Sequence, residues 1–158
     1  MEISIRGYED GDAPTLIEVF ERSVRVIGPS KYSDMQVAAW LSPSRDARAW
    51  NRRILEREAY VAQRGDGRIV GWIEMEANGH LDFLYCAPDA AGKGVADMLY
   101  AVLLAGARKL GVTHMTTEAS RFAESFFRRQ GWQVEKRETV MRSGIGIDRA
   151  VMTIDLPV

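Results

Sequence analysis

A turn with paired glycines, at residues 86–96, has the clearest chemical potential in this chain. The segment reads Cys-Ala-Pro-Asp-Ala-Ala-Gly-Lys-Gly-Val-Ala and joins an apolar, strand-like run to a long helix-like run. Such a turn can aim several backbone N–H groups, and the positive end of a helix dipole, at one anionic group. Gly92 and Gly94 have no Cβ to hold a phosphate away, and Lys93 adds a mobile positive charge. The pattern therefore predicts a phosphate-binding turn.

Acidic residues of three consecutive strand-like segments form a second group with chemical potential. The candidates for a general base in this region are Glu74, Glu76, His80 and Asp82. Strand alternation predicts that Glu74 shares a face with Trp72, and that Asp82 shares a face with His80, Leu84 and Cys86. A carboxylate among apolar strand residues can serve as a general base, directly or through water. The plainer interpretation of each acid is a hydrogen-bonded or solvent-exposed carboxylate.

The elements that must position these residues follow from periodicity and capping signals. We expect helices that begin after Asp12 and after Ser33, an Arg-rich helix over 46–57, a long helix over 93–110, and a helix capped by Ser120 that ends near Gln130. Strands are expected over 3–6, 59–63, 69–76, 80–86, 114–118, 132–140 and 147–156. The order predicts an α/β fold in which an antiparallel meander precedes a right-handed crossover, with helices on both faces of a mixed sheet.

Length and composition limit the possible functions. The chain has 158 residues and a net charge of −1, which predicts one domain over 1–158 and gives no general attraction for nucleic acid or an anionic membrane. One cysteine and two histidines exclude an internal disulfide and offer little for a metal site, so no metal is expected. No apolar run approaches the ~20 residues of a membrane span, and the N-terminus lacks the form of a signal peptide. A cytoplasmic location is expected.

Two motifs, in this order of elements, resemble the GNAT superfamily of N-acetyltransferases. Residues 91–96 (Ala-Gly-Lys-Gly-Val-Ala) are similar to its acetyl-CoA signature, with Ala91 in place of the usual Gln or Arg. Residues 120–132 are similar to its second signature, with Ser120 where Asn is common and Phe127 where many members have Tyr. The spacing of Tyr32, Trp40 and Trp50 resembles a bacterial subgroup in which Phe at the position of Phe127 is usual.

The resemblance implies a sheet of about seven strands with a splayed parallel pair, and acetyl-CoA as co-substrate in the gap. The acetyl group would pass to a primary amine of a small molecule by direct attack in a ternary complex. The residues implied for the cofactor are Leu84, Tyr85, Cys86, Ala91, Gly92, Lys93, Gly94, Val95, Ala96, Ser120 and Phe127. Those implied for the acceptor are Tyr32, Trp40, Trp50 and Trp72. The catalytic candidates are Asp82, which is the first choice as base, Glu74, and Tyr85 as proton donor to the thiolate.

Several alternatives stay open at this point. The chain could instead be a non-catalytic acyl-CoA-binding module, or an acetyltransferase of protein N-termini or lysines. Tyr85 and the tryptophans have a second interpretation as packed aromatic residues. Cys86 is more typical of a small buried hydrophobic residue than of a covalent acetyl carrier. Edge strands near residues 152–156 leave pairing across a homodimer open.

Overall fold

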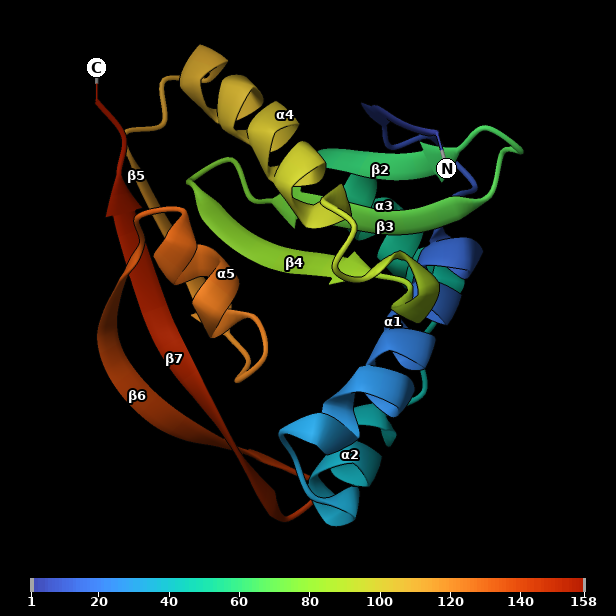
Figure 1. Cartoon of the computed structure of the whole chain (residues 1–158), viewed down its shortest axis with the longest axis vertical. Helices are drawn as coiled ribbons and strands as arrows, with labels where there is room; N and C mark the ends of the chain where they lie inside the picture. Colours follow the sequence, from blue (N-terminus) through green and yellow to red (C-terminus); the bar gives the residue numbers. More distant parts are fainter. Residues whose placement is uncertain (1, 158) are drawn as a thin grey trace.

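A seven-stranded mixed sheet forms the centre of the computed structural model, which describes residues 2–157 (Figure 1). The strands are β1 (Ile3–Gly7), β2 (Glu58–Arg64), β3 (Ile69–Met75), β4 (His80–Cys86), β5 (His114–Ala119), β6 (Gln133–Arg142) and β7 (Ile145–Asp155). Their order in the sheet is β1-β2-β3-β4-β5-β7-β6. The β4–β5 pair is parallel, and the other neighbouring pairs are antiparallel. The predicted fold class is confirmed.

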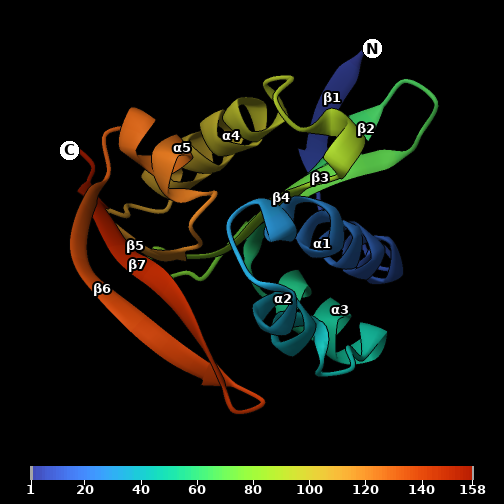
Figure 2. The ribbon, with the colours of Figure 1, turned by 60° about the horizontal axis from the view of Figure 1, so that its bottom comes forward.

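Helices cover both faces of this sheet. They are α1 (Ala13–Ile27), α2 (Asp34–Leu41), α3 (Ala47–Leu55), α4 (Val95–Lys109) and α5 (Glu124–Arg129), with short 3₁₀ turns at Gly28–Ser30 and Pro88–Ala90. Figure 2 shows α1, α2 and α3 on one side of the sheet and α4 and α5 on the other. Within residues 2–157, no helix is long and apolar enough to cross a membrane.

Local capping signals explain where two of these helices begin. Ser33 and Gln36 form the expected capping box at the start of α2, each side chain bonding the other residue's backbone. Asp12 does occupy the N-cap of α1, but its carboxylate makes no cap hydrogen bond. Arg6 and the backbone N–H of Glu9 donate to that carboxylate instead. The position was predicted correctly, and the capping interaction was not.

The helix predicted from Ser120 begins later than expected. Its first residue is Glu124, and Ser120 provides no side-chain cap. The carbonyl of Ser120 instead accepts hydrogen bonds from the N–H groups of Ala123 and Glu124, which closes a tight turn over 120–123. This turn leaves Phe122 and Ala123 at the end of β5, outside regular secondary structure.

A β-bulge in β4 corrects the predicted face of Asp82. Glu74 pairs with Phe83 and Met75 with Leu81, so Asp82 has no partner in β3. The extra residue interrupts the alternation of side chains between the two faces. As a result, Asp82 reaches the same guanidinium as Glu74, rather than the face of Leu84. Regular alternation predicted that Asp82 lies on the opposite face of the sheet. It missed the bulge, because a bulge depends on the register between β3 and β4.

The register assigns the remaining residues of β3 and β4 to two faces. Trp72, Glu74, Phe83 and Tyr85 lie toward α1 and α3, and Gly71, Ile73, Leu84 and Cys86 lie toward α4. Helix α4 comes close to this second face at Gly106. A Cβ on Gly106 would lie 2.6 Å from Tyr60 Oη and from Glu58 Oε2, so a larger residue there would require these side-chain ends to move.

The parallel strands β4 and β5 separate soon after they meet. Their paired residues are His80 with Thr116 and Leu81 with Thr117. Beyond these, β5 remains paired with β7 as far as Ala119, while β4 remains paired with β3 as far as Cys86. The sheet therefore divides into two halves, and a gap opens between the carboxyl ends of β4 and β5.

Candidate active site

A cavity of about 420 Å³ lies on the α4 side of the gap and is called the cofactor cavity below. Its lining comes from the end of β4, the turn before α4, the start of α4, residues 122–129, and the last turns of α1 at Ser23 and Ile27. The predicted cofactor residues in this lining are Leu84, Tyr85, Cys86, Ala91, Gly92, Gly94, Val95 and Ala96. Lys93 does not line it and is exposed.

The turn at residues 91–94 has a backbone conformation that favours glycine. Gly92 and Gly94 have φ values of +73° and +79°, and an added Cβ at either residue would meet no protein atom within 4 Å. Gly94 is the N-cap of α4, and its carbonyl accepts from Met98 N–H. The amides that precede Met98 at this end are not used by helical hydrogen bonds. They are available to an anion in the cofactor cavity.

The edge of β4 that faces the gap offers further backbone groups. Ala87 N–H donates to Val70 O across the β3–β4 pair. In an antiparallel pair successive residues point their backbone groups to alternate edges, so those of Cys86 and Leu84 point away from β3. They face the gap, and the backbone of Tyr85 faces β3. An extended chain with amide groups could add here as a strand would.

A second cavity, of about 600 Å³, lies on the side of α1 and α3 and is called the acceptor cleft below. Its aromatic lining consists of Phe20, Tyr32, Trp40, Trp50, Phe83, Tyr85, Phe122 and Phe127. Its charged lining consists of Arg45, Asp46, Arg53, Asp82, Glu118, Arg142, Asp148 and Arg149. Of the residues predicted for the acceptor, Tyr32, Trp40 and Trp50 line this cleft. Trp72 is fully buried and lies outside the lining.

The two cavities share four lining residues, which are Leu84, Tyr85, Phe122 and Ala123. They therefore meet where β4 and β5 have separated. Ser120 and Phe127, which were predicted for the cofactor, line the acceptor cleft. Phe126, Ala123 and Arg129 line the cofactor cavity and were not predicted. The residues of the second motif therefore divide between the two cavities.

Contacts between the α1–α2 connection and the β6–β7 hairpin close one end of the acceptor cleft. Tyr32 Oη donates to Asp148 O (3.0 Å) and accepts from Arg121 N–H (2.9 Å). Gln36 Nε2 donates to Gly146 O (3.0 Å), and the Ser42 and Ser143 hydroxyl oxygens are 2.6 Å apart. These bonds join segments more than 80 residues apart in the chain, and they hold α2 against β7.

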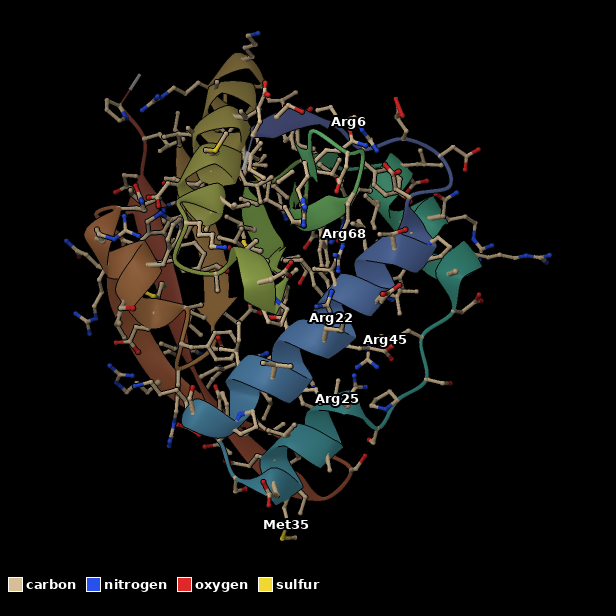
Figure 3. All side chains as sticks on the ribbon, turned by 45° about the vertical axis from the view of Figure 1, so that its right-hand side comes forward. Arg6, Arg22, Arg25, Met35, Arg45 and Arg68 are labelled. Atoms are coloured by element: carbon tan, nitrogen blue, oxygen red, sulfur yellow. The ribbon has the colours of Figure 1, made fainter. Side chains whose placement is uncertain are left out.

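Arg45 fixes the other wall of the cleft beside α1 (Figure 3). Its guanidinium donates to the carbonyls of Trp40, Leu41 and Pro43, at the C-terminal end of α2. It also pairs with Glu21 and lies 4.5 Å from the centre of the Phe20 ring. A cation at a helix C-terminus is favourable to the dipole and satisfies carbonyls that the helix leaves unpaired. Arg45 thereby holds Trp40 in the cleft wall.

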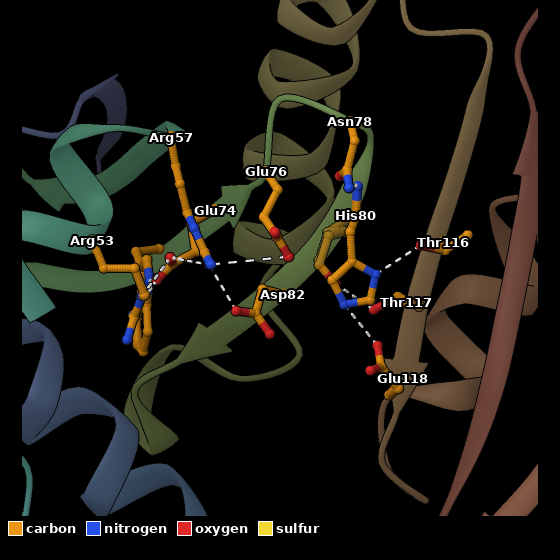
Figure 4. A network of polar contacts seen from close by, with 12 residues as sticks. Arg53, Arg57, Glu74, Glu76, Asn78, His80, Asp82, Thr116, Thr117 and Glu118 are labelled. Carbon is orange, nitrogen blue, oxygen red and sulfur yellow. Dashed lines mark hydrogen bonds and ion pairs between the residues drawn. The ribbon is translucent and has the colours of Figure 1, made fainter.

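Glu74 is fully buried and its carboxylate is fully occupied (Figure 4). Arg53 donates to both of its oxygens (3.1 and 2.7 Å), and Arg57 donates to Oε2 (2.9 Å). The indole N–H of Trp72 donates to Oε1 (3.1 Å). Glu74 does not line the acceptor cleft. It sits beneath the cleft and holds Arg53 and Arg57 in place.

Asp82 lines the cleft directly. Its Oδ2 lies 2.7 Å from Arg57 Nη1, and about a third of its side chain is exposed. Arg57 Nη2 also lies 3.9 Å from Glu76. Asp82 is therefore a cleft carboxylate with a permanent cation on one side.

Glu118 is a second cleft carboxylate, and sequence reasoning missed it. Its Oε2 lies 2.8 Å from His80 Nε2, while His80 Nδ1 lies 2.7 Å from Thr116 Oγ1 (Figure 4). The hydrogen bond with Glu118 is the main cause that raises the pKa of His80 above its ordinary value. The same bond lowers the pKa of Glu118, and the charge of Arg149 lowers it further. Only the pairing of β4 with β5 brings these residues together.

Burial changes the proton affinities of Tyr85 and Cys86, where the two cavities meet. Burial raises the pKa of the Tyr85 phenol well above its ordinary value, so the phenol keeps its proton at neutral pH. Burial also raises the pKa of the Cys86 thiol to about 12. A thiol of that pKa is a poor nucleophile at neutral pH. The interpretation of Cys86 as a small apolar residue is the better supported one.

Comparison with known proteins identifies the class to which this fold belongs. A GCN5-related N-acetyltransferase structure from Rhodopseudomonas palustris superimposes with a TM-score of 0.89 and 29% identity, covering 99% of both chains. A PaiA N-acetyltransferase from Thermoplasma acidophilum, in complex with coenzyme A, shares the fold with a TM-score of 0.79 at 21% identity, covering 98% of this chain and 99% of that one. An acetyltransferase from Salmonella typhimurium, solved with acetyl-CoA, does so with a TM-score of 0.75 at 18% identity, covering 100% and 96%. These are N-acetyltransferase folds.

Sequence comparison gives the family itself. Residues 29–155 match the family model described as an acetyltransferase (GNAT) domain. The uncharacterized N-acetyltransferase YafP of Escherichia coli (strain K12) is 30% identical over 138 residues, which are 87% of this chain and 86% of that protein. The chain belongs to the GNAT acetyltransferase family, and the predicted resemblance is confirmed. It is an enzyme of the N-acetyltransferase class.

Proposed function

We propose that this enzyme transfers an acetyl group from acetyl-CoA to a primary amine of a small molecule, by direct attack in a ternary complex. The observation that carries the proposal is the meeting of the cofactor cavity and the acceptor cleft at Leu84 and Tyr85. A thioester that reaches this point from one side would face an amine that enters from the other.

The cofactor cavity suits the parts of acetyl-CoA. The free edge of Leu84 and Cys86 would hydrogen-bond the amide groups of the pantetheine arm. The unused amides around Gly92 and Gly94 would hold the pyrophosphate at the start of α4. Two proteins of the same fold, solved with coenzyme A and with acetyl-CoA, support this ligand. The free thiol of Cys86 is consistent with a cytoplasmic enzyme.

A small acceptor is favoured over a protein acceptor by the closure of the cleft. The bonds of Tyr32 and Gln36 to the β6–β7 hairpin close the end at which a polypeptide would otherwise pass. Aromatic rings line much of the remaining wall. A short amine with an apolar or aromatic body fits such a cleft better than an extended peptide.

The chemistry follows from the groups where the cavities meet. The acceptor's ammonium would be held near Asp82 and would lose one proton before it attacks the thioester carbonyl. The new C–N bond forms, the C–S bond breaks, and the coenzyme A thiolate takes a proton. Tyr85 is the proposed donor of that proton, because its phenol remains protonated where the sulfur would lie. As the amide forms, the attacking nitrogen gives up its second proton, which restores the Tyr85 phenol.

Calorimetric titration of acetyl-CoA into the purified chain tests the cofactor site. Micromolar binding is expected, and Gly94→Glu should abolish it, because a carboxylate there repels the pyrophosphate. Gly111→Glu is the matched control, since Gly111 has a similar φ of +78° in open space at the other end of α4. Like Gly94→Glu it places a side chain at a positive φ and should lose stability, yet it should bind acetyl-CoA normally.

Release of free coenzyme A thiol with a panel of primary amines then tests turnover. We would use 2-phenylethylamine, tryptamine and putrescine, together with a lysine-containing peptide. Turnover with at least one free amine, and little with the peptide, supports the proposal. Acetyl-CoA binding without turnover would favour the non-catalytic binding module, and no binding at all would refute the cofactor site.

A further inference from the structure

Two carboxylates from different strands lie where the sheet divides. Asp82 is the unpaired bulge residue of β4, and Glu118 is the first residue of β5 after the last pair, which joins Leu81 to Thr117. Both line the acceptor cleft. An amine that approaches the thioester through this cleft passes between the two strands that carry them.

The cations that hold these carboxylates differ in kind (Figure 4). Asp82 is bound by Arg57, a guanidinium that keeps its charge at any physiological pH. Glu118 is bound by the imidazole of His80, whose charge changes near neutral pH. The guanidinium of Arg149 lies farther from Glu118, at 3.9 Å. The guanidinium keeps its full charge beside Asp82 throughout the physiological pH range, whereas the imidazole brings a full charge to Glu118 only when it is protonated.

We propose that Glu118 is the catalytic residue that takes the proton from the bound ammonium, and that His80 is its positioning residue. The inference rests on the proposed function. The N–H bond of the ammonium breaks and its proton passes to a carboxylate oxygen of Glu118. The nitrogen keeps the electron pair and uses it to attack the thioester. Asp82, paired with Arg57, supplies negative charge that binds the ammonium. After the products leave, Glu118 returns its proton to water.

The contacts of His80 explain how the ring can hold Glu118 in place. Thr116 and Glu118 are two residues apart on β5 and project from the same face. The Nδ1 atom of His80 contacts Thr116, and its Nε2 atom contacts Glu118. A carboxylate can only accept, so Nε2 carries a proton and Nδ1 accepts from the Thr116 hydroxyl when the ring is neutral. The neutral ring thereby orients the Glu118 carboxylate without adding a second positive charge to that of Arg149, which lies 3.9 Å away.

The charge of His80 should therefore appear in the pH dependence of the reaction. The charged groups that face the ring are Glu118 on β5, Asp82 on β4 and Glu76 after β3, all negative. Together they raise the pKa of His80, with Glu118 as the largest cause. Below that pKa the imidazolium weakens Glu118 as a base, and above it the base recovers. The value of kcat/KM should rise as pH increases through the raised pKa of His80.

The test compares Glu118→Gln and His80→Gln with the parent enzyme between about pH 6 and about pH 10. The acceptor is whichever of 2-phenylethylamine, tryptamine or putrescine the parent acetylates. Glu118→Gln should lower kcat roughly 100-fold and leave acetyl-CoA binding by calorimetry unchanged. His80→Gln keeps a neutral donor toward Glu118, so it should retain most activity at high pH. It should lose the rise of kcat/KM with pH that deprotonation of His80 causes.

Two matched controls accompany these variants. Glu135→Gln makes the same change at an exposed residue of β6 outside both cavities, and His114→Gln replaces an exposed histidine. Both should retain the parent's kcat and pH profile. A Glu118→Gln enzyme with kcat within about threefold of the parent overturns the inference. The inference is also overturned if kcat/KM of His80→Gln rises with pH as it does in the parent enzyme.

Failure of the inference can be told apart from failure of the proposed function. If the parent enzyme acetylates an amine and Glu118→Gln does so equally well, only the inference is wrong. If the parent binds acetyl-CoA but acetylates none of the three amines, the proposed acceptor class falls, and the inference falls with it.

Discussion

Glu74 and Asp82 share one nitrogen atom of Arg57, which lies 2.9 Å from an oxygen of the first and 2.7 Å from an oxygen of the second. Glu74 is fully buried and Asp82 lines the acceptor cleft. The Arg57 guanidinium therefore links the buried Glu74 carboxylate to the Asp82 carboxylate, which a substrate can reach. Asp82 is thereby held from beneath the cleft. The same network fixes Arg53 beside Trp50 and Phe83.

Glu74→Gln should destabilise the protein by about 3 kcal/mol, because two arginines then lose the charge of their shared buried partner. Urea denaturation monitored by tryptophan fluorescence measures the free energy of unfolding. Glu76→Gln is the control, since Glu76 is 40% exposed and lies 3.9 Å from Arg57. It should cost less than about 1 kcal/mol. Equal losses in the two variants would show that burial of Glu74 has no special part in stability.

Tyr32→Phe should loosen the closed end of the acceptor cleft. The change removes a donor to Asp148 O and an acceptor of Arg121 N–H, and we expect a loss of about 1–2 kcal/mol in stability. The KM for the amine should rise several-fold while the KM for acetyl-CoA stays constant. Tyr8→Phe is the matched control, because its hydroxyl bonds Asn51 outside the cleft. A change in neither KM would mean that this closure does not shape the acceptor site.

Tyr85→Phe should lower kcat about 100-fold with little effect on the KM for acetyl-CoA, if the phenol donates to the departing thiolate. Packing is preserved, because the ring stays 4.9 Å from Phe20 and 5.5 Å from Trp72 between centroids. Tyr60→Phe, on the opposite face of the sheet, gives the background effect of losing a hydroxyl. An unchanged kcat in Tyr85→Phe would return Tyr85 to the role of a packed aromatic residue.

Glu124 should contribute to stability only above acidic pH. Its hydrogen bonds with Arg137 and Arg128 lower the pKa of Glu124 to about 2, from 4.5 without them. A lowered pKa in the folded state gives stability that is full above the unfolded pKa and is lost as pH falls toward about 2. The two arginine side chains are more than half exposed, so the contribution is at most about 1 kcal/mol.

Urea denaturation of the parent and Glu124→Gln at about pH 7 and about pH 3 checks this expectation. The difference between the two proteins should shrink at the lower pH. A difference that does not depend on pH would mean that the arginines do not act through the charge of Glu124. The result matters for the site, because α5 carries Phe126 and Phe127, which line the two cavities.

Features that depend on neighbouring residues in the sequence were predicted well. The capping box of Ser33 and Gln36 needs residues only three positions apart, and the turn between β4 and α4 is marked by the paired glycines Gly92 and Gly94. The order of strands could also be predicted, because turn signals and alternation mark each strand, and the crossover between β4 and β5 has one hand. These features position the cofactor cavity, which is why half of its lining residues were anticipated.

Features that depend on how distant strands pair were missed. The side of β4 on which Asp82 lies depends on a bulge opposite Glu74, which alternation cannot reveal. Glu118 gave no signal of its own, because its partner His80 is 38 positions away and meets it only through the parallel pair. The occupied state of Glu74 likewise required Arg53 and Arg57, which the sequence marked only as part of an Arg-rich helix.

Because Asp82 is an extra residue of β4, its place in the cleft depends on the number of residues in this strand as well as on their types. Strand β4 holds one residue more than its pairing with β3 requires. Removing that single residue would restore regular pairing and leave no side chain at the place of Asp82, even if every other residue were kept. Relatives that differ by an insertion or deletion here should thus differ in acceptor chemistry more than their percentage identity suggests. Alignments that treat a one-residue gap in this strand as noise would conceal that difference.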